Sequence, residues 1–270
     1  MRWPASMTRR FRPDTAGVLV CALLVVFAVW LLVAGNPDGR WATLLDNAHW
    51  TFSYTAAALM VWFSLRDCEP GELAARRWIA LGLSGLALGQ WIWDLQVFVG
   101  WNPFPAPSDA AFLLPGLCML TCFSVVMRKR LPATRHRQVA LDVIGFALSA
   151  MALVLSLYLP RGLESTTMQM VVLTAYPVLL LSAGAAALVM QFYLRLQWTV
   201  RWVALLVGVI GQSVVWMTWN MATLDNSLAA GAYLNLGFSV LALILGWGAA
   251  GWRLQEDRSA RFDRFCEVCI

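Results

Sequence analysis

Eight apolar segments constrain the fold of this chain more than any other feature of its sequence. A bilayer core takes roughly 20 apolar residues per helix, and inside lipid every backbone polar group needs a partner within the protein. The segments therefore predict an all-α fold, a polytopic membrane helix bundle with eight transmembrane helices. They do not alternate between apolar and polar residues, as the strands of a membrane β-barrel would. The segments are 17–34, 48–65, 78–99, 110–127, 139–159, 169–193, 201–222 and 230–252.

The composition favours a membrane bundle over a soluble domain. The chain is 60% hydrophobic and 13% charged, whereas a soluble domain has about half apolar and about a quarter charged residues. Its 15 tryptophans gather near the ends of the apolar segments, where aromatic rings favour the membrane–water interface. We therefore expect one integral membrane domain over residues 17–252.

The distribution of basic residues predicts the orientation of the bundle. Eighteen of the 20 Lys and Arg residues lie in the N-terminus, the even-numbered connectors and the C-terminal tail, and only Arg40 and Arg161 lie on the other side. Because Lys and Arg accumulate in cytoplasmic loops, both termini are predicted to be cytoplasmic, in a multi-pass protein of the cell inner (plasma) membrane. Residues 1–16 then form a basic cytoplasmic N-terminus and residues 253–270 a cytoplasmic tail or linker. The basic face predicts contact with anionic lipid and excludes nucleic acid as a partner.

The connectors are too short to hold an extracytoplasmic domain, so any stimulus must be read within the membrane or at its outer surface. The charged tail continues from the last span with no partner of its own, which favours a longer protein with a further domain after residue 270. The basic pair Arg9-Arg10 precedes an apolar segment that is too long for a cleavable signal peptide. We therefore expect the first span to be retained.

The third span ends in Gly-Gln90-Trp-Ile-Trp93-Asp94, which is one candidate site. Gln90 and Asp94 share a helix face at i and i+4, and Trp93 lies beside them. An ionisable residue below the outer surface is costly unless it is paired or hydrated, which marks Asp94 as a functional candidate. The alternative is an interfacial aspartate satisfied by a neighbouring amide or by water.

Other polar and aromatic residues fall in the outer half of the membrane under this topology. They predict an aromatic, polar pocket open to the outside, which is the usual character of a small-ligand site. The alternative is an interfacial aromatic belt with hydrogen bonds between helices. These residues are Asn47, His49, Ser53, Tyr54, Gln212, Ser213, Trp216, Thr218, Trp219, Asn220, Tyr233 and Asn235.

No pattern predicts catalysis, a cofactor or a metal. His49 has no second histidine on its side of the membrane, and Cys266-x-x-Cys269 is half of a zinc or redox site without a second pair. Cys118 and Cys122 are expected to be packing residues, and no cysteine lies in a connector assigned to the outside, so no disulfide framework is expected. The chain has no Walker loop, nucleophile elbow, HExxH or paired-carboxylate pattern.

A proline-rich connector follows the third span and opens the fourth. Its prolines, Pro103, Pro105 and Pro107, hold the backbone extended. Ser108 or Asp109 is then expected to cap the fourth helix, where the negative charge of Asp109 favours the helix N-terminus. This rigid outer turn would set the third and fourth helices against each other and present Asp109 near Asp94.

The segment Pro103-Phe-Pro-Ala-Pro-Ser-Asp109-Ala-Ala-Phe112-Leu-Leu resembles a stretch, Pro-Phe-Pro-Ser-x-Ala-Asp-x-x-Tyr-Leu, found in multi-span N-terminal membrane sensor domains of bacterial signalling proteins. Those domains precede GGDEF diguanylate cyclase, EAL phosphodiesterase or histidine kinase modules. Neighbouring features fit the same order, with Gln-Trp-Ile-Trp-Asp94 before the stretch, and Leu141-Asp142 and Ala175-Tyr176-Pro177 after it. The resemblance covers roughly residues 75–252.

The resemblance implies a membrane-embedded signal-input module that regulates a C-terminal cytoplasmic output domain, for cyclic-di-GMP turnover or phosphotransfer, absent from this chain. The expected partners are the bilayer, an unidentified small ligand or membrane signal, and a second copy of the chain in a homodimer. The alternatives are a small multi-span transporter or channel, which would need polar or broken helices through the midplane, and a membrane enzyme acting on lipid. The ligand-pocket candidates are Gln90, Trp93, Asp94, Asp109 and Asn220.

Overall fold

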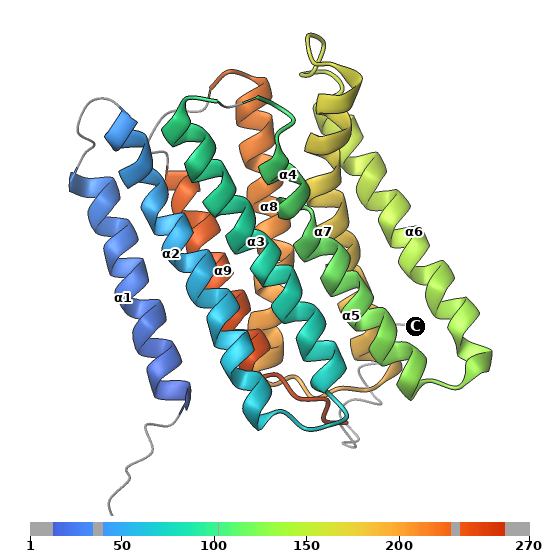
Figure 1. Cartoon of the computed structure of the whole chain (residues 1–270). Helices are drawn as coiled ribbons and strands as arrows, with labels where there is room; N and C mark the ends of the chain where they lie inside the picture. The colour runs from blue at the N-terminus through green and yellow to red at the C-terminus, as the bar shows by residue number, and fades with distance from the viewer. Residues whose placement is uncertain (1–12, 35–39, 102, 228–232, 257–270) are drawn as a thin grey trace, which may run out of the picture.

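The computed structural model describes residues 13–34, 40–101, 103–227 and 233–256, with side chains over 17–30, 47–101, 103–227 and 234–256. Most of the predicted N-terminal and C-terminal segments, 1–16 and 253–270, lies outside these residues, as does Cys266-x-x-Cys269. All eight predicted segments are helical, and the fourth is divided into α4 and α5 (Figure 1). The helices are α1 Pro13–Ala34, α2 Arg40–Ser64, η1 Leu65–Asp67, α3 Leu73–Val99, α4 Pro107–Phe112, α5 Leu114–Arg130, α6 Ala133–Tyr158, α7 Thr167–Tyr193, α8 Val200–Leu224 and α9 Tyr233–Gly251.

Among the described residues, five helices are long and apolar enough to cross a membrane. The described part of α1 is apolar but shorter, Gly17–Trp30. Buried polar side chains such as His49, Ser53 and Gln90 reduce the apolar character of α2 and α3. The five are Pro107–Arg130, Ala133–Tyr158, Thr167–Tyr193, Val200–Leu224 and Leu234–Gly251.

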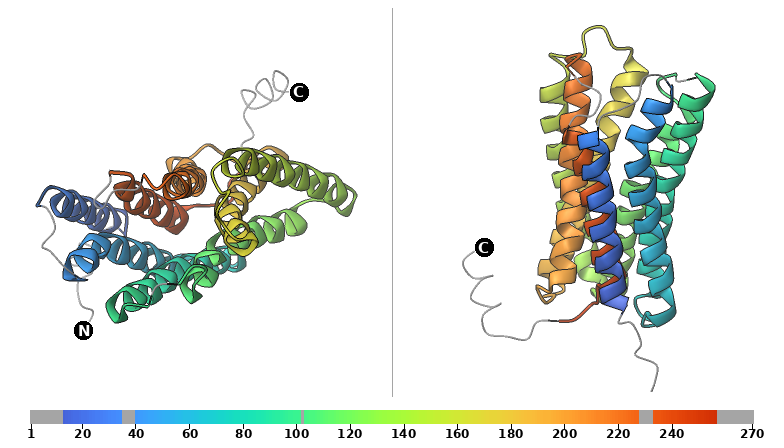
Figure 2. Two further views of the ribbon diagram at one scale, coloured as in Figure 1. Left: turned by 90° about the horizontal axis from the view of Figure 1, so that it is seen from above. Right: turned by 90° about the vertical axis from the view of Figure 1, so that its left-hand side faces the viewer.

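Six of the described helices form a closed ring, and one further helix packs against the outside of the ring on each of two opposite sides. Around the ring, α2 packs on α3, α3 on α5, α5 on α7, α7 on α8, α8 on α9 and α9 on α2. Helix α1 contacts α2 and α9 on one side, and α6 contacts mainly α7 at the other (Figure 2). The outward surface of these helices is apolar, with Leu23 68% exposed and Leu153 51% exposed. A surface so apolar fits a hydrocarbon environment better than water.

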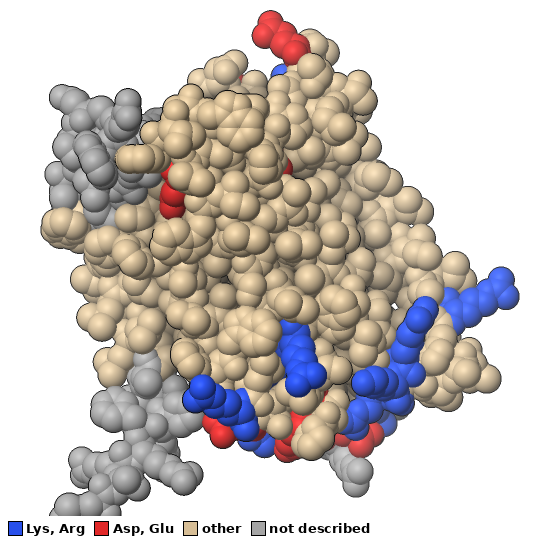
Figure 3. Space-filling model, viewed as in Figure 1, with Lys and Arg blue, Asp and Glu red and all other residues tan. Residues whose placement is uncertain are grey.

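The basic end of the ring is filled by aromatic side chains. Phe123 of α5, Trp202 of α8 and Trp252, which follows α9, are each no more than 1% exposed. The rings of Trp202 and Trp252 stack with centroids 5.3 Å apart, and the Phe123 ring lies 6.2 Å and 6.3 Å from them. This cluster closes the interior of the ring on the side where Lys and Arg side chains gather (Figure 3).

The chain leaves α9 through a buried clamp supplied by α3 and the residue before it. The Arg76 guanidinium donates to the carbonyl oxygens of Ala250, at 3.0 Å, and Trp252. Glu72 pairs with Arg76 at 3.4 Å and accepts a hydrogen bond from the Leu254 backbone N–H at 2.5 Å. The Arg76 donors satisfy carbonyls that the end of α9 leaves without partners in the helix. The exit of α9 is therefore tied to the start of α3.

Helices approach closely at small residues on α3, where Gly82, Gly85 and Gly89 face the segment that contains α4 and α5. A Cβ on Gly85 would lie 2.6 Å from the Leu114 Cβ and 3.0 Å from the Ala111 carbonyl oxygen. A Cβ on Gly89 would lie 2.7 Å from the Phe112 ring. These glycines hold Phe112 and the start of the fourth span against α3.

We expect Gly85→Ala to lower the free energy of unfolding by about 1–3 kcal/mol, because the added methyl group overpacks a contact with neighbouring backbone. The matched control is Gly145→Ala on α6, where a Cβ would meet nothing within 4 Å and better helix propensity should leave stability equal or higher by up to about 1 kcal/mol. Unfolding in SDS titrations measures both. Equal losses would contradict close packing at Gly85.

Candidate functional site

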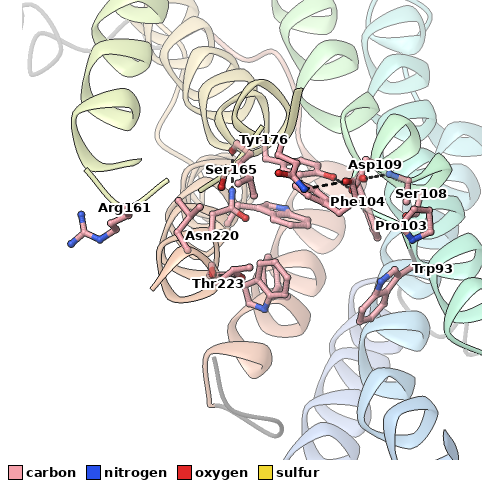
Figure 4. Close-up of a pocket in the computed structure, with 18 of the residues that line it drawn as sticks. Trp93, Pro103, Phe104, Ser108, Asp109, Arg161, Ser165, Tyr176, Asn220 and Thr223 are labelled. Carbon is pink, nitrogen blue, oxygen red and sulfur yellow. Dashed lines mark hydrogen bonds between the residues drawn. The ribbon is translucent and has the colours of Figure 1, made fainter. Parts of the chain in front are cut away.

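A cavity of about 710 Å³ opens at the end of the ring opposite the aromatic cluster (Figure 4). Its wall takes residues from α2, α3, α4, α7, α8 and α9, and its mouth takes residues from the connectors before α4 and α7. The lining includes charged, amide and aromatic side chains, among them Gln90, Trp93, Asp109, Arg161, Glu164, Tyr176, Trp216, Trp219, Asn220 and Phe238.

Four of the five predicted pocket residues line this single cavity: Gln90, Trp93, Asp109 and Asn220. Of the connector motif, Pro103 and Ser108 also line it, while Pro105 and Pro107 do not. The cavity brings together side chains that are up to 188 residues apart in the sequence, Trp50 and Phe238 being the extremes.

The start of α4 differs from the expected cap. Ala106 is the N-cap residue, Pro107 follows it at the first helical position, and neither Ser108 nor Asp109 occupies the cap. Asp109 instead reaches back one turn, where its Oδ2 accepts a hydrogen bond from the Ala106 N–H at 2.5 Å. Proline is suited to the first position because its missing N–H would have had no partner there. Asp109 therefore fixes the helix start from the third position.

Asp109 also joins α4 to α7. The Tyr176 hydroxyl donates a hydrogen bond to Asp109 Oδ1, and Figure 4 shows the two side chains pointing toward one another. The Tyr176 ring stacks on the Trp216 ring of α8, with centroids 4.3 Å apart and planes 9° from parallel. One carboxylate thus connects the connector motif with an aromatic pair from two further helices.

Asn220 compensates for a proline in the middle of α7. Pro177 has no N–H, so the carbonyl of Leu173, four residues earlier, lacks its helical donor. The Asn220 amide supplies one, with Nδ2 2.9 Å from the Leu173 oxygen. Ser213 likewise donates to the Pro177 carbonyl at 2.8 Å. Asn220 is completely buried, and its Oδ1 accepts no hydrogen bond.

Asp94 has a different environment from the other candidates. Its Oδ2 accepts from the Thr51 hydroxyl of α2 at 2.5 Å, and its Oδ1 accepts from the Gln90 amide at 2.9 Å. It does not line the cavity. Asp94 and Asp109 were expected to lie near each other, but they do not share a site. Asp94 is hydrogen-bonded to α2, and Asp109 is hydrogen-bonded to α7. Asp94 holds Gln90, which does reach the cavity wall.

Aromatic rings form much of the wall around this polar set. The Trp216 ring contacts Phe238 at 4.9 Å, Phe112 at 5.7 Å and Trp219 at 6.0 Å between centroids. Further round, Trp50 lies 5.7 Å from Trp93 and 5.6 Å from Phe238. The interface-belt alternative does not describe these rings, since they pack edge to face around a hollow.

Sequence reasoning missed the residues at the mouth of the cavity, which lie between α6 and α7. Arg161 pairs with Asp225 at 3.1 Å, and Gln169 Nε2 donates to the Phe104 carbonyl at 3.3 Å, joining this connector to the proline-rich one. Glu164 is exposed at the rim. Arg161 stood out as one of the two basic residues outside the basic face, which was the one available signal.

Within the described residues, no group of three or more His, Cys, Asp or Glu side chains could hold a metal ion. His49 instead shares a 2.7 Å hydrogen bond between its Nδ1 and the Ser239 hydroxyl, which links α2 to α9. Cys118 and Cys122 are buried free thiols on the packed face of α5.

Comparisons of the chain with protein-family models, with curated proteins and with solved structures find no match. The function is therefore proposed from the geometry of the site, together with the family resemblance of the connector motif.

We expect Asp94→Ala to lower the free energy of unfolding by about 1–3 kcal/mol, because the buried Gln90 amide loses its acceptor. Asp225→Ala, which breaks a half-exposed pair with Arg161, should cost no more than about 1 kcal/mol. SDS-titration unfolding compares the two. A loss at Asp94 no larger than that at Asp225 would mean that Asp94 does not stabilise the α2–α3 contact.

Proposed function

We propose that this chain is the membrane-embedded input module of a sensory protein, in which the cavity binds a small molecule from the outer side. The observation that carries the proposal is the asymmetry of the ring. It is hollow beside the proline-rich connector and closed by Phe123, Trp202 and Trp252 at the opposite end. A cavity of about 710 Å³ is within the size range of small-ligand sites.

The proposed topology has eight membrane spans and both termini in the cytoplasm of an inner-membrane protein. The described Lys and Arg residues support it, because they lie at the end opposite the cavity with the exceptions of Arg161 and of Arg40, the first residue of α2 (Figure 3). Lys and Arg favour the cytoplasmic side, and they would contact anionic lipid there. The cavity then opens to the outside.

The route to an output domain is proposed to be α9. This helix contributes Phe238 to the cavity wall, and its far end is held by Arg76 and Glu72 at the proposed cytoplasmic face. A ligand that binds one arrangement of the ring better than another shifts the population toward it. Such a shift would alter the clamp at the point where the chain leaves the membrane.

The proposed output follows from the resemblance of the connector motif, residues 103–114, to sensor domains that precede cyclic-di-GMP or histidine kinase modules. The structure gives a physical role to Asp109 of this motif and to Tyr176 and Pro177, which belong to a later feature of the same resemblance. All three contribute to one wall of the cavity or support it. A transporter would need access from both sides, and the aromatic cluster at the basic end argues against it.

We expect a membrane-impermeant maleimide to label Ser165→Cys in intact cells, because Ser165 lies at the cavity mouth. Lys129→Cys at the basic end should react only after permeabilisation. The unsubstituted protein, with its native cysteines, sets the background. Labelling of Lys129→Cys but not Ser165→Cys in intact cells would reverse the proposed orientation.

Access to the cavity interior separates a sensor from a transporter. Ala106 lines the cavity and is half-buried, so Ala106→Cys should react with a small impermeant methanethiosulfonate added outside intact cells. The same reagent added to the outside of sealed inside-out vesicles, where it meets only the basic face, should not reach it. Reaction from both sides would favour the transporter and refute the sensor proposal.

We expect Glu72→Ala to raise hydrogen exchange at the Leu254 amide roughly tenfold or more, because its buried acceptor is removed. The control is Glu69→Ala, which removes an exposed pair with Arg253 at 3.1 Å and should leave Leu254 unchanged. Mass spectrometry of peptides covering 252–256 in lipid nanodiscs makes the measurement. Unchanged exchange in Glu72→Ala would mean that the clamp does not hold the exit of α9.

A further inference from the structure

We propose that the ligand of this cavity is an organic cation, an amine or ammonium group carried on an apolar body. This inference rests on the proposed function, because it assigns a chemical class to the small molecule that the cavity would bind. It depends on two features of the lining: its charge and its aromatic rings.

The charged groups of the cavity leave an excess of negative charge. The charged lining residues are Asp109, Glu164 and Arg161. Arg161 is neutralised by Asp225, which lies 3.1 Å from its Nε, and its Nη1 donates to the Leu157 carbonyl at 2.7 Å. Asp109 and Glu164 have no basic partner among the described residues. An anionic ligand would meet two carboxylates and an already paired guanidinium.

Aromatic rings surround the inner carboxylate. Asp109 accepts from the Tyr176 hydroxyl, Tyr176 stacks on Trp216, and Trp216 contacts Phe238 and Trp219. The π-faces of such rings attract a cation within about 6 Å, most strongly in a desolvated site. A carboxylate among indole and phenol rings is the combination that selects ammonium groups over neutral ones.

The remaining wall is apolar, formed by side chains such as Phe112, Leu173 and Phe238. The inferred ligand is therefore amphipathic, with its charge at Asp109 and its body along the rings.

Three probes on one carbon frame test the charge: 4-phenylbutylammonium, 4-phenylbutanol and 4-phenylbutyrate. The full chain is placed in nanodiscs of zwitterionic lipid, and binding is followed by calorimetry and by tryptophan fluorescence against empty nanodiscs. We expect the cation to bind roughly tenfold or more tightly than the alcohol, and the carboxylate to bind most weakly.

Two variants assign the preference to the cavity. Asp109→Asn keeps a side-chain oxygen for the Ala106 N–H but removes the charge, so it should abolish most of the preference for the cation. Glu164→Gln at the exposed rim does not threaten folding and should weaken cation binding a few-fold, in a salt-dependent manner. Glu69→Gln at the opposite end is the matched control and should change nothing.

Equal or tighter binding of the alcohol or the carboxylate would overturn the cation inference, as would an unchanged preference in both variants. Binding of none of the three probes would also overturn it. None of these results bears on the sensor proposal, because one-sided labelling of Ala106→Cys measures access to the cavity without any ligand. Failure of that labelling would remove the proposed function itself.

Discussion

A missing N–H in α7 determines the packing of the half of this protein that contains the cavity. Pro177 deprives the Leu173 carbonyl of its helical donor, and in hydrocarbon no water can replace it. Asn220 of α8 supplies the donor at 2.9 Å, and Ser213 binds the Pro177 carbonyl one turn deeper. These two bonds fix α7 against α8 and place Tyr176, the residue before the proline, on Trp216. Tyr176 then holds Asp109, and Asp109 holds the start of α4. The cavity wall therefore depends on all of these hydrogen bonds.

The helices could be predicted from the sequence because lipid leaves few alternatives. Every apolar segment of spanning length is helical where the structure describes it. The ring was not predictable, since apolar periodicity says which residues are buried but not which helix covers them. It is specified by side chain to backbone bonds between distant helices, such as Trp50 Nε1 to the Asn235 carbonyl at 2.7 Å.

The candidate site, like the fold, could be predicted from the sequence only in part. Gln90, Trp93, Asp109 and Asn220 were identified because polar and aromatic residues in the outer half of a membrane need a reason to be there. Asp94 obeys the same rule for a different reason, since Thr51 and Gln90 satisfy it between α2 and α3. Sequence could not separate the two aspartates, because both lie near a helix end. Glu164 and Ser165 could not be found at all, since polar residues in a connector are expected without any function.

The two ends of the ring make opposite use of aromatic side chains. At the basic end, Trp202 and Trp252 stack and are buried, and the backbone of Trp252 is bound by Arg76. At the other end, similar rings stand around a space. Packing that is complete at one end and incomplete at the other leaves the rings of the cavity wall uncovered. A ligand that covers them stabilises whichever arrangement of α7, α8 and α9 fits it. Because α9 runs from Phe238 at the cavity to Trp252 at the closed end, that stabilisation has a direct path to the clamped exit of the chain.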